Sequence, residues 1–102
     1  MIEDISVIKL KERIEKGEKI NLIDVREPFE YEEFHLNGEL IPLGDLPGRL
    51  SDIEHLKNQE VIVHCKSGVR SATAQRFLIA NGFTNVRNLV GGVLDWQREF
   101  PD

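Results

Sequence analysis

The sequence predicts an α/β fold in which helices cover both faces of a parallel sheet. Short runs rich in valine, isoleucine and leucine alternate along the chain with segments whose apolar residues recur at helical spacing. The 102 residues, of which 40% are hydrophobic and 30% charged, match one compact domain with a single core. We therefore expect residues 1–102 to form one domain with one active site.

The first half of the chain is expected to hold two helices and three strands. Residues 6–17 predict a helix, because a capping serine precedes apolar residues at helical spacing and a glycine ends the pattern. Residues 19–25 form an apolar run that is typical of a central strand buried on both faces. A proline opens a short helix over 28–34, and short strands are expected over 2–5 and 39–41.

The second half repeats this alternation. Apolar spacing predicts a helix over 46–56, and a β-branched run predicts a strand over 60–64. A further helix begins near residue 70 and stops at the glycine at position 82. A last strand over 86–89 is followed by a Gly-Gly turn and a closing helix over 93–100. The order of elements is that of a parallel α/β sheet.

The acidic composition excludes two classes of partner. The formal net charge is −5 and the pI is near 5.2. Nucleic acids and anionic membranes bind clustered lysine and arginine, so we expect neither as a partner. The first twelve residues contain no apolar run resembling a signal peptide or a membrane span, which predicts a cytoplasmic protein.

Cys65 is the only cysteine, which restricts the available chemistry. A single cysteine excludes an intrachain disulfide, a CxxC redox pair and a cysteine-rich zinc site. The three histidines do not fall into a pattern of metal ligands, so we expect no metal and no other cofactor. Any reaction at Cys65 must use one sulfur atom.

The stretch 61–71 carries the strongest chemical signal. It reads as a buried strand, a loop containing glycine and the start of a helix. Loop N–H groups and a helix N-terminus together favour an anion at such a strand end. A thiolate at Cys65 would be that anion, with a thiol pKa below its ordinary value of about 8.5. The alternative is an unreactive cysteine that serves as a small buried hydrophobe, but the glycine loop and its cations favour the reactive one.

Three segments resemble the signature motifs of rhodanese-like sulfurtransferases. Residues 65–71, Cys-Lys-Ser-Gly-Val-Arg-Ser, resemble the active loop of that family. Residues 22–31 are similar to its N-terminal signature, and residues 82–92, followed by Trp96, to its C-terminal one. The motifs span nearly the whole chain in the family's order. The resemblance implies a three-layer α/β/α fold, with a five-stranded parallel sheet and the loop at its carboxyl edge.

The resemblance also implies a reaction in two steps. The Cys65 thiolate takes sulfane sulfur from an anionic donor such as thiosulfate and becomes a persulfide. Cyanide, a thiol or a protein acceptor then removes that sulfur. Covalent nucleophilic catalysis of this kind gives ping-pong kinetics. The chain is interpreted as a thiosulfate sulfurtransferase of the rhodanese type.

The predicted site consists of the whole loop: Cys65, Lys66, Ser67, Gly68, Val69, Arg70 and Ser71. Cys65 is the nucleophile and the other six bind the substrate. Lys66 and Arg70 are expected to bind the anionic end of the donor, since arginine can fork two hydrogen bonds onto an oxyanion. The hydroxyls of Ser67 and Ser71 either donate to the sulfur or cap the helix.

Two further residues are predicted to support the loop from a neighbouring strand. Asp24 and Arg26 follow a buried run, and parallel strands end at one edge, so Asp24 is expected to brace the loop. Arg26 is expected to pair with Glu27 or Glu30. His64 precedes Cys65 directly, so strand alternation points it away from the thiol and predicts a structural role.

Two other functions are compatible with the sequence. A persulfide carrier or regulatory module that receives sulfur from a protein partner would need the same cysteine and loop. A phosphatase or arsenate reductase is the third possibility, but the related cell-cycle phosphatases place one more residue between Cys and Arg than the four found here. The chain departs from the family pattern over 34–39, a segment that borders the family's site, which leaves the acceptor preference open.

Overall fold

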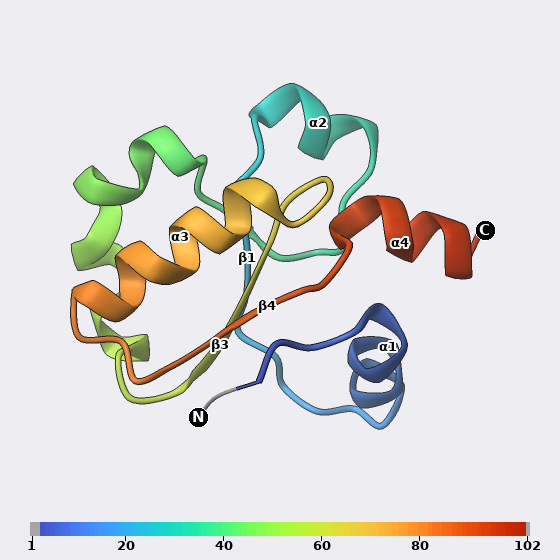
Figure 1. Ribbon diagram of the computed structural model, residues 1–102, viewed down its shortest axis with the longest axis horizontal. Coiled ribbons are helices and arrows are strands. Elements are labelled where there is room, and N and C mark those ends of the chain that lie inside the picture. Colours follow the sequence, from blue (N-terminus) through green and yellow to red (C-terminus); the bar gives the residue numbers. More distant parts are fainter. Residues whose placement is uncertain (1–2, 102) are drawn as a thin grey trace.

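Helices and strands alternate throughout residues 3–101, which are the residues that the computed structural model describes (Figure 1). In chain order the elements are α1 (Val7–Glu15), β1 (Leu22–Asp24), α2 (Pro28–Glu33), β2 (Glu39–Leu40), η1 (Leu43–Leu56), β3 (Glu60–His64), α3 (Val69–Ala80), β4 (Asn85–Asn88) and α4 (Gly92–Glu99). The predicted α/β alternation is confirmed.

The sheet consists of four parallel strands in the order β2-β1-β3-β4. The longest strand, β3, lies inside the sheet between β1 and β4. All of β1 and nearly all of β3 are buried, as expected for strands covered on both faces. Because the strands are parallel, their carboxyl ends meet at one edge. The helix α2, the loop before α3 and the start of α4 lie at that edge (Figure 1).

The prediction of a fifth strand is wrong. Residue 2 of the expected strand lies outside the described residues, and Ile5 forms only an isolated parallel bridge with Leu89. A longer strand would pair the N–H of Asn88 with backbone, but the Asp4 carboxylate accepts that N–H at 3.0 Å. The Glu3 carbonyl accepts instead from an arginine side chain. Side chains thus take the hydrogen bonds that would have extended the ladder.

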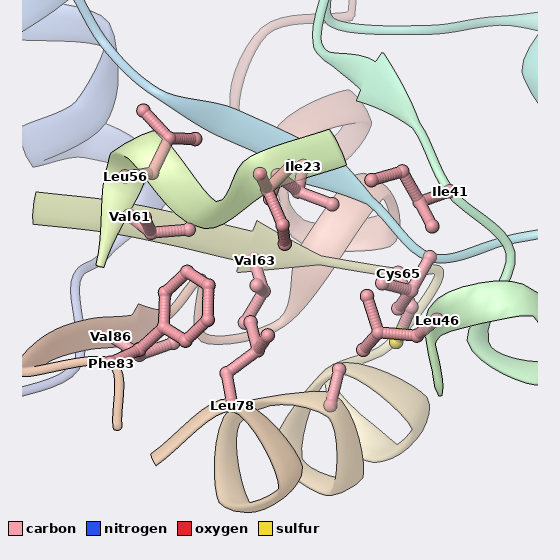
Figure 2. Packing of buried hydrophobic residues seen from close by; sticks show 13 residues of the cluster. Ile23, Ile41, Leu46, Leu56, Val61, Val63, Cys65, Leu78, Phe83 and Val86 are labelled. Atoms are coloured by element: carbon pink, nitrogen blue, oxygen red, sulfur yellow. The ribbon is translucent and has the colours of Figure 1, made fainter. Parts of the chain in front are cut away.

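One face of the sheet packs against η1 and α3. The side chains of Val61 and Val63 project from β3 into a buried cluster that includes Leu46 and Ile53 of η1 and Leu78 of α3 (Figure 2). Each of these five side chains is essentially inaccessible to solvent. Burial of apolar area on this scale is the main stabilising contribution to such a fold.

The opposite face packs against α1 and α4. There Leu22 and Ile62 share a buried cluster with Leu10 of α1, and Trp96 and Phe100 pack against this cluster with their two rings edge to face. The two clusters together explain why the three central residues of β3, Val61, Ile62 and Val63, are all apolar. The sheet is therefore the middle layer of three.

Most predicted boundaries agree with the structure within a few residues. Ser6 caps α1 by accepting a hydrogen bond from the N–H of Lys9, and α3 begins at Val69. The segment expected to be a helix over 46–56 winds as a 3-10 helix that already begins at Leu43 and contains Pro47. Among residues 3–101 no helix is long and apolar enough to cross a membrane.

Candidate active site

Cys65 lies directly after β3, at the carboxyl edge of the sheet. Its side chain is 1% exposed and belongs to the cluster under η1 and α3 (Figure 2). Strand alternation continues through it, so Val63 and Cys65 face one side while Ile62 faces the other cluster. His64 shares the side of Ile62, which agrees with the prediction that it points away from the thiol.

The sulfur of Cys65 is surrounded by hydrogen-bond donors from the loop and the first turn of α3. The N–H of Gly68 donates to Sγ at 3.1 Å and the N–H of Ser71 at 3.4 Å. The Ser71 hydroxyl also lies 3.4 Å from Sγ. Burial by itself raises the pKa of the Cys65 thiol, but these hydrogen bonds and one from the Ser67 N–H outweigh it, so the pKa lies below its usual value. The predicted cradle for a thiolate is present.

Two glycines give the loop its shape. Gly68 precedes α3 with φ +109°, a conformation that places its N–H toward the sulfur and that other residues rarely adopt. At Gly92, an added Cβ would lie only 2.4 Å from the carbonyl oxygen of Cys65. The first amides of α4 hold the outer side of the loop, since Val93 N–H donates to Cys65 O and Leu94 N–H to Lys66 O. With its carbonyls held outward, the loop can present N–H groups to the sulfur.

Asn88, at the end of β4, is a site residue that the sequence analysis did not identify. Its side-chain amide donates to the carbonyl of Gly68 at 3.1 Å and accepts from the Ser71 hydroxyl at 2.6 Å. The Ser71 hydroxyl carries one hydrogen, and the shorter contact assigns that hydrogen to Asn88 while Cys65 is a thiol. When Cys65 ionises, the hydroxyl can turn to the thiolate at the expense of this bond. Ser71 therefore does not cap the helix; it links the sulfur to β4.

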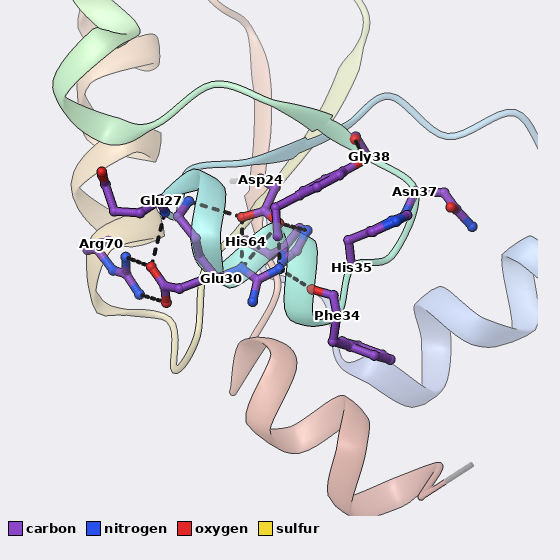
Figure 3. A network of polar contacts seen from close by, with 11 residues as sticks. Asp24, Glu27, Glu30, Phe34, His35, Asn37, Gly38, His64 and Arg70 are labelled. Carbon is purple, nitrogen blue, oxygen red and sulfur yellow. Dashed lines mark hydrogen bonds and ion pairs between the residues drawn. The ribbon is translucent and has the colours of Figure 1, made fainter.

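Arg70 points to a carboxylate on α2. Its two terminal nitrogens donate to the two carboxylate oxygens of Glu30 at 2.8 and 2.9 Å (Figure 3). This hydrogen-bonded pair lowers the pKa of Glu30 to about 2 and raises that of Arg70. Glu30 also accepts the N–H of Glu27 in a capping box at the start of α2. The sequence suggested Glu30 only as a partner of Arg26, and its place beside the loop was not predicted.

The other loop residues lie toward solvent. The side chains of Lys66, Ser67 and Val69 are exposed, Val69 to 74%. Of these, Ser67 acts on the sulfur through its backbone N–H. Lys66 lines a pocket next to the loop, together with Arg70.

That pocket has a volume of about 560 Å³ and lies between α2, the loop and α4. Its lining combines charged and apolar side chains. The residues are Arg26, Glu27, Phe29, Glu30, Glu33, Phe34, Lys66, Arg70, Val93, Leu94 and Gln97. Phe34, at the start of the segment that departs from the family pattern, is among them. Of the loop 65–71, the pocket is lined by Lys66 and Arg70.

The predicted partner of Arg26 is wrong. Arg26 is buried and binds the carboxylate of Asp24, with the shortest contact at 2.8 Å, and it donates a further hydrogen bond to the carbonyl of Phe34. The Asp24 carboxylate accepts hydrogen bonds from both the guanidinium and the backbone N–H of Arg26. One of its oxygens lies 3.8 Å from Nε2 of His64 (Figure 3). The pair ties the end of β1 to the end of α2. Burial lowers the pKa of His64 to about 4.

These features define a class of protein: a parallel α/β domain in which one cysteine, whose sulfur accepts hydrogen bonds from loop amides, lies at the carboxyl edge of the sheet. Residues 6–99 match the rhodanese-like domain. The chain belongs to this family.

Individual relatives support the assignment. The candidate sulfur carrier protein YrkF of Bacillus subtilis is 38% identical over 93% of this chain, which spans 51% of YrkF. The candidate sulfurtransferase YtwF of the same organism is 37% identical, with 96% of this chain and 93% of that protein covered. The crystal structure of a rhodanese-like domain protein from Staphylococcus aureus superimposes with a TM-score of 0.83 at 31% identity, over 94% of this chain and 91% of that one. Both named relatives are described as sulfur-handling proteins.

Proposed function

We propose that this protein is a sulfurtransferase in which the Cys65 thiolate carries sulfane sulfur as a persulfide. The observation that carries the proposal is the set of donors around Sγ: the N–H groups of Gly68 and Ser71 and the Ser71 hydroxyl lie within 3.4 Å. Such donors stabilise a negative sulfur before the reaction and the outer sulfur of a persulfide after it. Cys65, the sole cysteine, needs no second thiol for this chemistry.

The first half-reaction loads sulfur onto the protein. The Cys65 thiolate attacks the outer sulfur of a donor such as thiosulfate and forms an S–S bond. The S–S bond of thiosulfate breaks, and its electron pair leaves with sulfite. The charge of the thiolate passes to the outer sulfur of the new persulfide, so no proton transfer and no cofactor are required.

The second half-reaction returns the enzyme to its starting state. Cyanide or the thiolate of an acceptor attacks the outer sulfur, and the electron pair of the persulfide S–S bond returns to Sγ of Cys65. The product is thiocyanate or a new persulfide on the acceptor. Because the two substrates react in turn, steady-state kinetics are expected to be ping-pong. A free, reactive thiol of this kind suits a reducing compartment, and we place the reaction in the cytoplasm.

Thiocyanate formation from thiosulfate and cyanide tests the proposal. The wild-type protein is expected to turn over, and Cys65→Ser is expected to be inactive although folded. Retention of activity in the folded Cys65→Ser protein would overturn the proposal. An aryl phosphate and arsenate serve as further substrates in the same experiment. We expect no turnover with the phosphate, since a loop with four residues between Cys65 and Arg70 suits a sulfur atom better than a phosphoryl group.

A persulfide carrier is the second candidate function. The observation that favours it is the Glu30–Arg70 pair, because an arginine that is already bound by a carboxylate is a poor ligand for a free anion. The relative named as a candidate sulfur carrier points the same way. Saturable turnover of thiosulfate favours the enzyme, whereas rapid transfer from a protein persulfide with weak thiosulfate turnover favours the carrier.

A further inference from the structure

The ion pair between Glu30 and Arg70 neutralises two of the charged groups that line the pocket beside the loop. Arg70 Nη1 lies 2.8 Å from Glu30 Oε2, and Nη2 lies 2.9 Å from Oε1. Fork-to-fork pairs of this kind fix the orientation of both groups. The Glu30 side chain is 14% exposed and that of Arg70 34%, so bulk water screens the pair only in part. Arg70 therefore offers an incoming donor a neutralised guanidinium.

A second cation of the pocket is neutralised in the same way. Arg26 lines the pocket, and its guanidinium binds the fully buried carboxylate of Asp24. The two arginines of the lining thus each carry a carboxylate partner. Their positive charge contributes little net field at the pocket.

The remaining lining is not suited to a dianion. Lys66 is the third cation, and it is opposed by the carboxylates of Glu27 and Glu33. Apolar side chains complete the surface, among them Phe29 at 64% exposure and Leu94 at 48%. A small dianion such as thiosulfate meets two carboxylates against one lysine here, together with apolar surface, whereas an uncharged or cationic group meets a complementary lining.

We propose that Glu30 is a specificity-determining residue that, by neutralising Arg70, disfavours small dianionic sulfur donors and favours substrates whose sulfur lies beside uncharged or cationic groups. The inference rests on the proposed sulfur transfer at Cys65. Glu30 acts through Arg70 and is a positioning residue. With its pKa at about 2, the Glu30 carboxylate keeps its charge throughout the neutral range, so its effect on selectivity is not expected to change between pH 6 and 8.

The Glu30→Gln variant tests the proposal with thiosulfate as the donor. Glutamine keeps the size and an acceptor oxygen but removes the charge. The KM for thiosulfate is expected to fall about five-fold, the effect of one partly screened charge, while kcat stays within about two-fold. Glu60→Gln is the matched control, because Glu60 is also held by arginine but lies at the other end of β3. The control is expected to leave the KM for thiosulfate unchanged.

A pair of acceptors tests the same charge in the second half-reaction. Cysteamine carries a cationic group beside its thiol, and mercaptoacetate carries an anionic one. The experiment compares the rates at which cysteamine and mercaptoacetate remove sulfur from the protein after it has been loaded with sulfur. The preference for cysteamine over mercaptoacetate is expected to fall about five-fold in Glu30→Gln relative to the wild type. The intrinsic reactivities of the two thiols cancel in this comparison.

The double variant Glu30→Gln with Arg70→Gln provides the decisive outcome. Removing both charges restores the neutral balance of the wild type, so the KM for thiosulfate is expected to return to within about two-fold of the wild-type value. This variant removes a complete ion pair, and it keeps the test available should the single variant not fold. An unchanged KM in folded Glu30→Gln, or a KM in the double variant far above that of the wild type, would overturn the inference.

The failure of this inference is distinguishable from failure of the proposed function. If no donor loads sulfur onto wild-type Cys65, the sulfur-transfer proposal itself is wrong. If wild type and variants all load sulfur with the same thiosulfate KM and the same acceptor preference, only the role of Glu30 is wrong.

Discussion

A glutamate bound by arginine occurs beside each end of β3, and the two sites differ in what the arginines connect. At the amino end, Glu60 accepts hydrogen bonds from Arg13 of α1 and Arg87 of β4, with the shortest contact at 2.6 Å. At the carboxyl end, Glu30 of α2 accepts from Arg70 in the first turn of α3. The hydrogen bonds lower the pKa of both glutamates. The chemistry of the pairs is the same.

The surroundings give the two pairs different consequences. The Glu60 cluster joins a helix and two strands of the packed domain, so its contribution is to stability. The Glu30 pair lines the pocket beside the reactive sulfur, so its charge balance acts on substrates. Ion pairs of similar geometry can thus be assigned different roles from the elements that they join and from the cavity that they face. Substitutions at the two ends of the sheet should therefore differ in their effects on activity and on stability.

Gly92→Ala should damage the carboxyl end most severely. Its Cβ would lie 2.4 Å from the carbonyl oxygen of Cys65 and 2.7 Å from that of Lys66, so the loop has to move. We expect the variant to lose most sulfur-transfer activity and about 2 kcal/mol or more of unfolding free energy. Chemical denaturation and the thiocyanate assay measure the two effects.

Gly17→Ala is the control at the other end of the sheet. Gly17 also has a positive φ, but a Cβ there meets no atom within 4 Å. Only the backbone strain of about 1 kcal/mol is expected, without loss of activity. Equal activities for the Gly92 and Gly17 variants would contradict the role given to the close approach at Gly92.

Glu60→Gln should lower stability without altering catalysis. The variant leaves Arg13 and Arg87 facing an uncharged amide and weakens the link between α1 and the sheet. We expect a loss of about 1–2 kcal/mol in unfolding free energy. Glu30→Gln, whose partner is a single half-exposed arginine, should lose less than about 1 kcal/mol. Urea denaturation of both variants measures the difference, and a larger loss at Glu30 would reverse the comparison.

Ser71→Ala should raise the pKa of the Cys65 thiol. A hydrogen bond to a charged group contributes about 1.5–3 kcal/mol, but the Ser71 hydroxyl gives up a neutral bond to Asn88 worth about 1 kcal/mol when it turns to the thiolate. The bond to the thiolate is the stronger of the two, so its loss is expected to raise the pKa of the thiol. Ultraviolet absorbance of the thiolate against pH measures it. Ser67→Ala is the control and should leave the pKa in place, because Ser67 acts through its backbone; a shift as large as that of Ser71→Ala would contradict this.

His64→Leu should alter the pH dependence of stability. His64 is buried beside Asp24, and both of its ring nitrogens lack a hydrogen-bond partner among residues 3–101. Its pKa is about 4 in the folded protein against an ordinary value of 6.5, so the unfolded chain binds a proton that the folded chain does not. Stability is therefore lost as the pH falls from 6.5 toward 4, with a slope of at most about 1.4 kcal/mol per unit.

The leucine variant removes this contribution. Its unfolding free energy should be close to that of the wild type at neutral pH, because an unpartnered polar group is replaced by an apolar one of similar size. The variant should become the more stable of the two as the pH falls below 6.5. Two stability curves that stay parallel from pH 7 to about 4.5 would contradict the neutral, buried state of His64.

The parts of the fold that depend on local sequence could be predicted. The boundaries of β3 and the start of α3 follow from a β-branched run and from the glycine in the loop that precedes α3, and the cradle around Cys65 follows from that order of elements. The extent of the edge strand could not be predicted. It depends on Asp4, whose carboxylate competes with backbone for the N–H of Asn88, a contact between residues 84 positions apart.

The partners of the charged residues depend on packing between separate elements. Arg26 was expected to pair with Glu27 or Glu30, but Glu30 is taken by Arg70, 40 residues further along the chain. Asn88, in contrast, could have been predicted as a site residue, because it is a polar residue at the end of the strand beside β3. Parallel strands end at one edge, so a polar side chain closing β4 is a candidate for the site at β3.

The intact mass of the protein tests the central claim most directly. The wild-type protein is treated with thiosulfate or with a low-molecular-weight persulfide, separated from the reagent and weighed, and the modified peptide is then identified. We predict a gain of one sulfur atom on the peptide that contains Cys65, its removal by cyanide, and no gain in Cys65→Ser. A folded wild-type protein that gains no sulfur from either donor would contradict the assignment of Cys65 as the sulfur-carrying nucleophile.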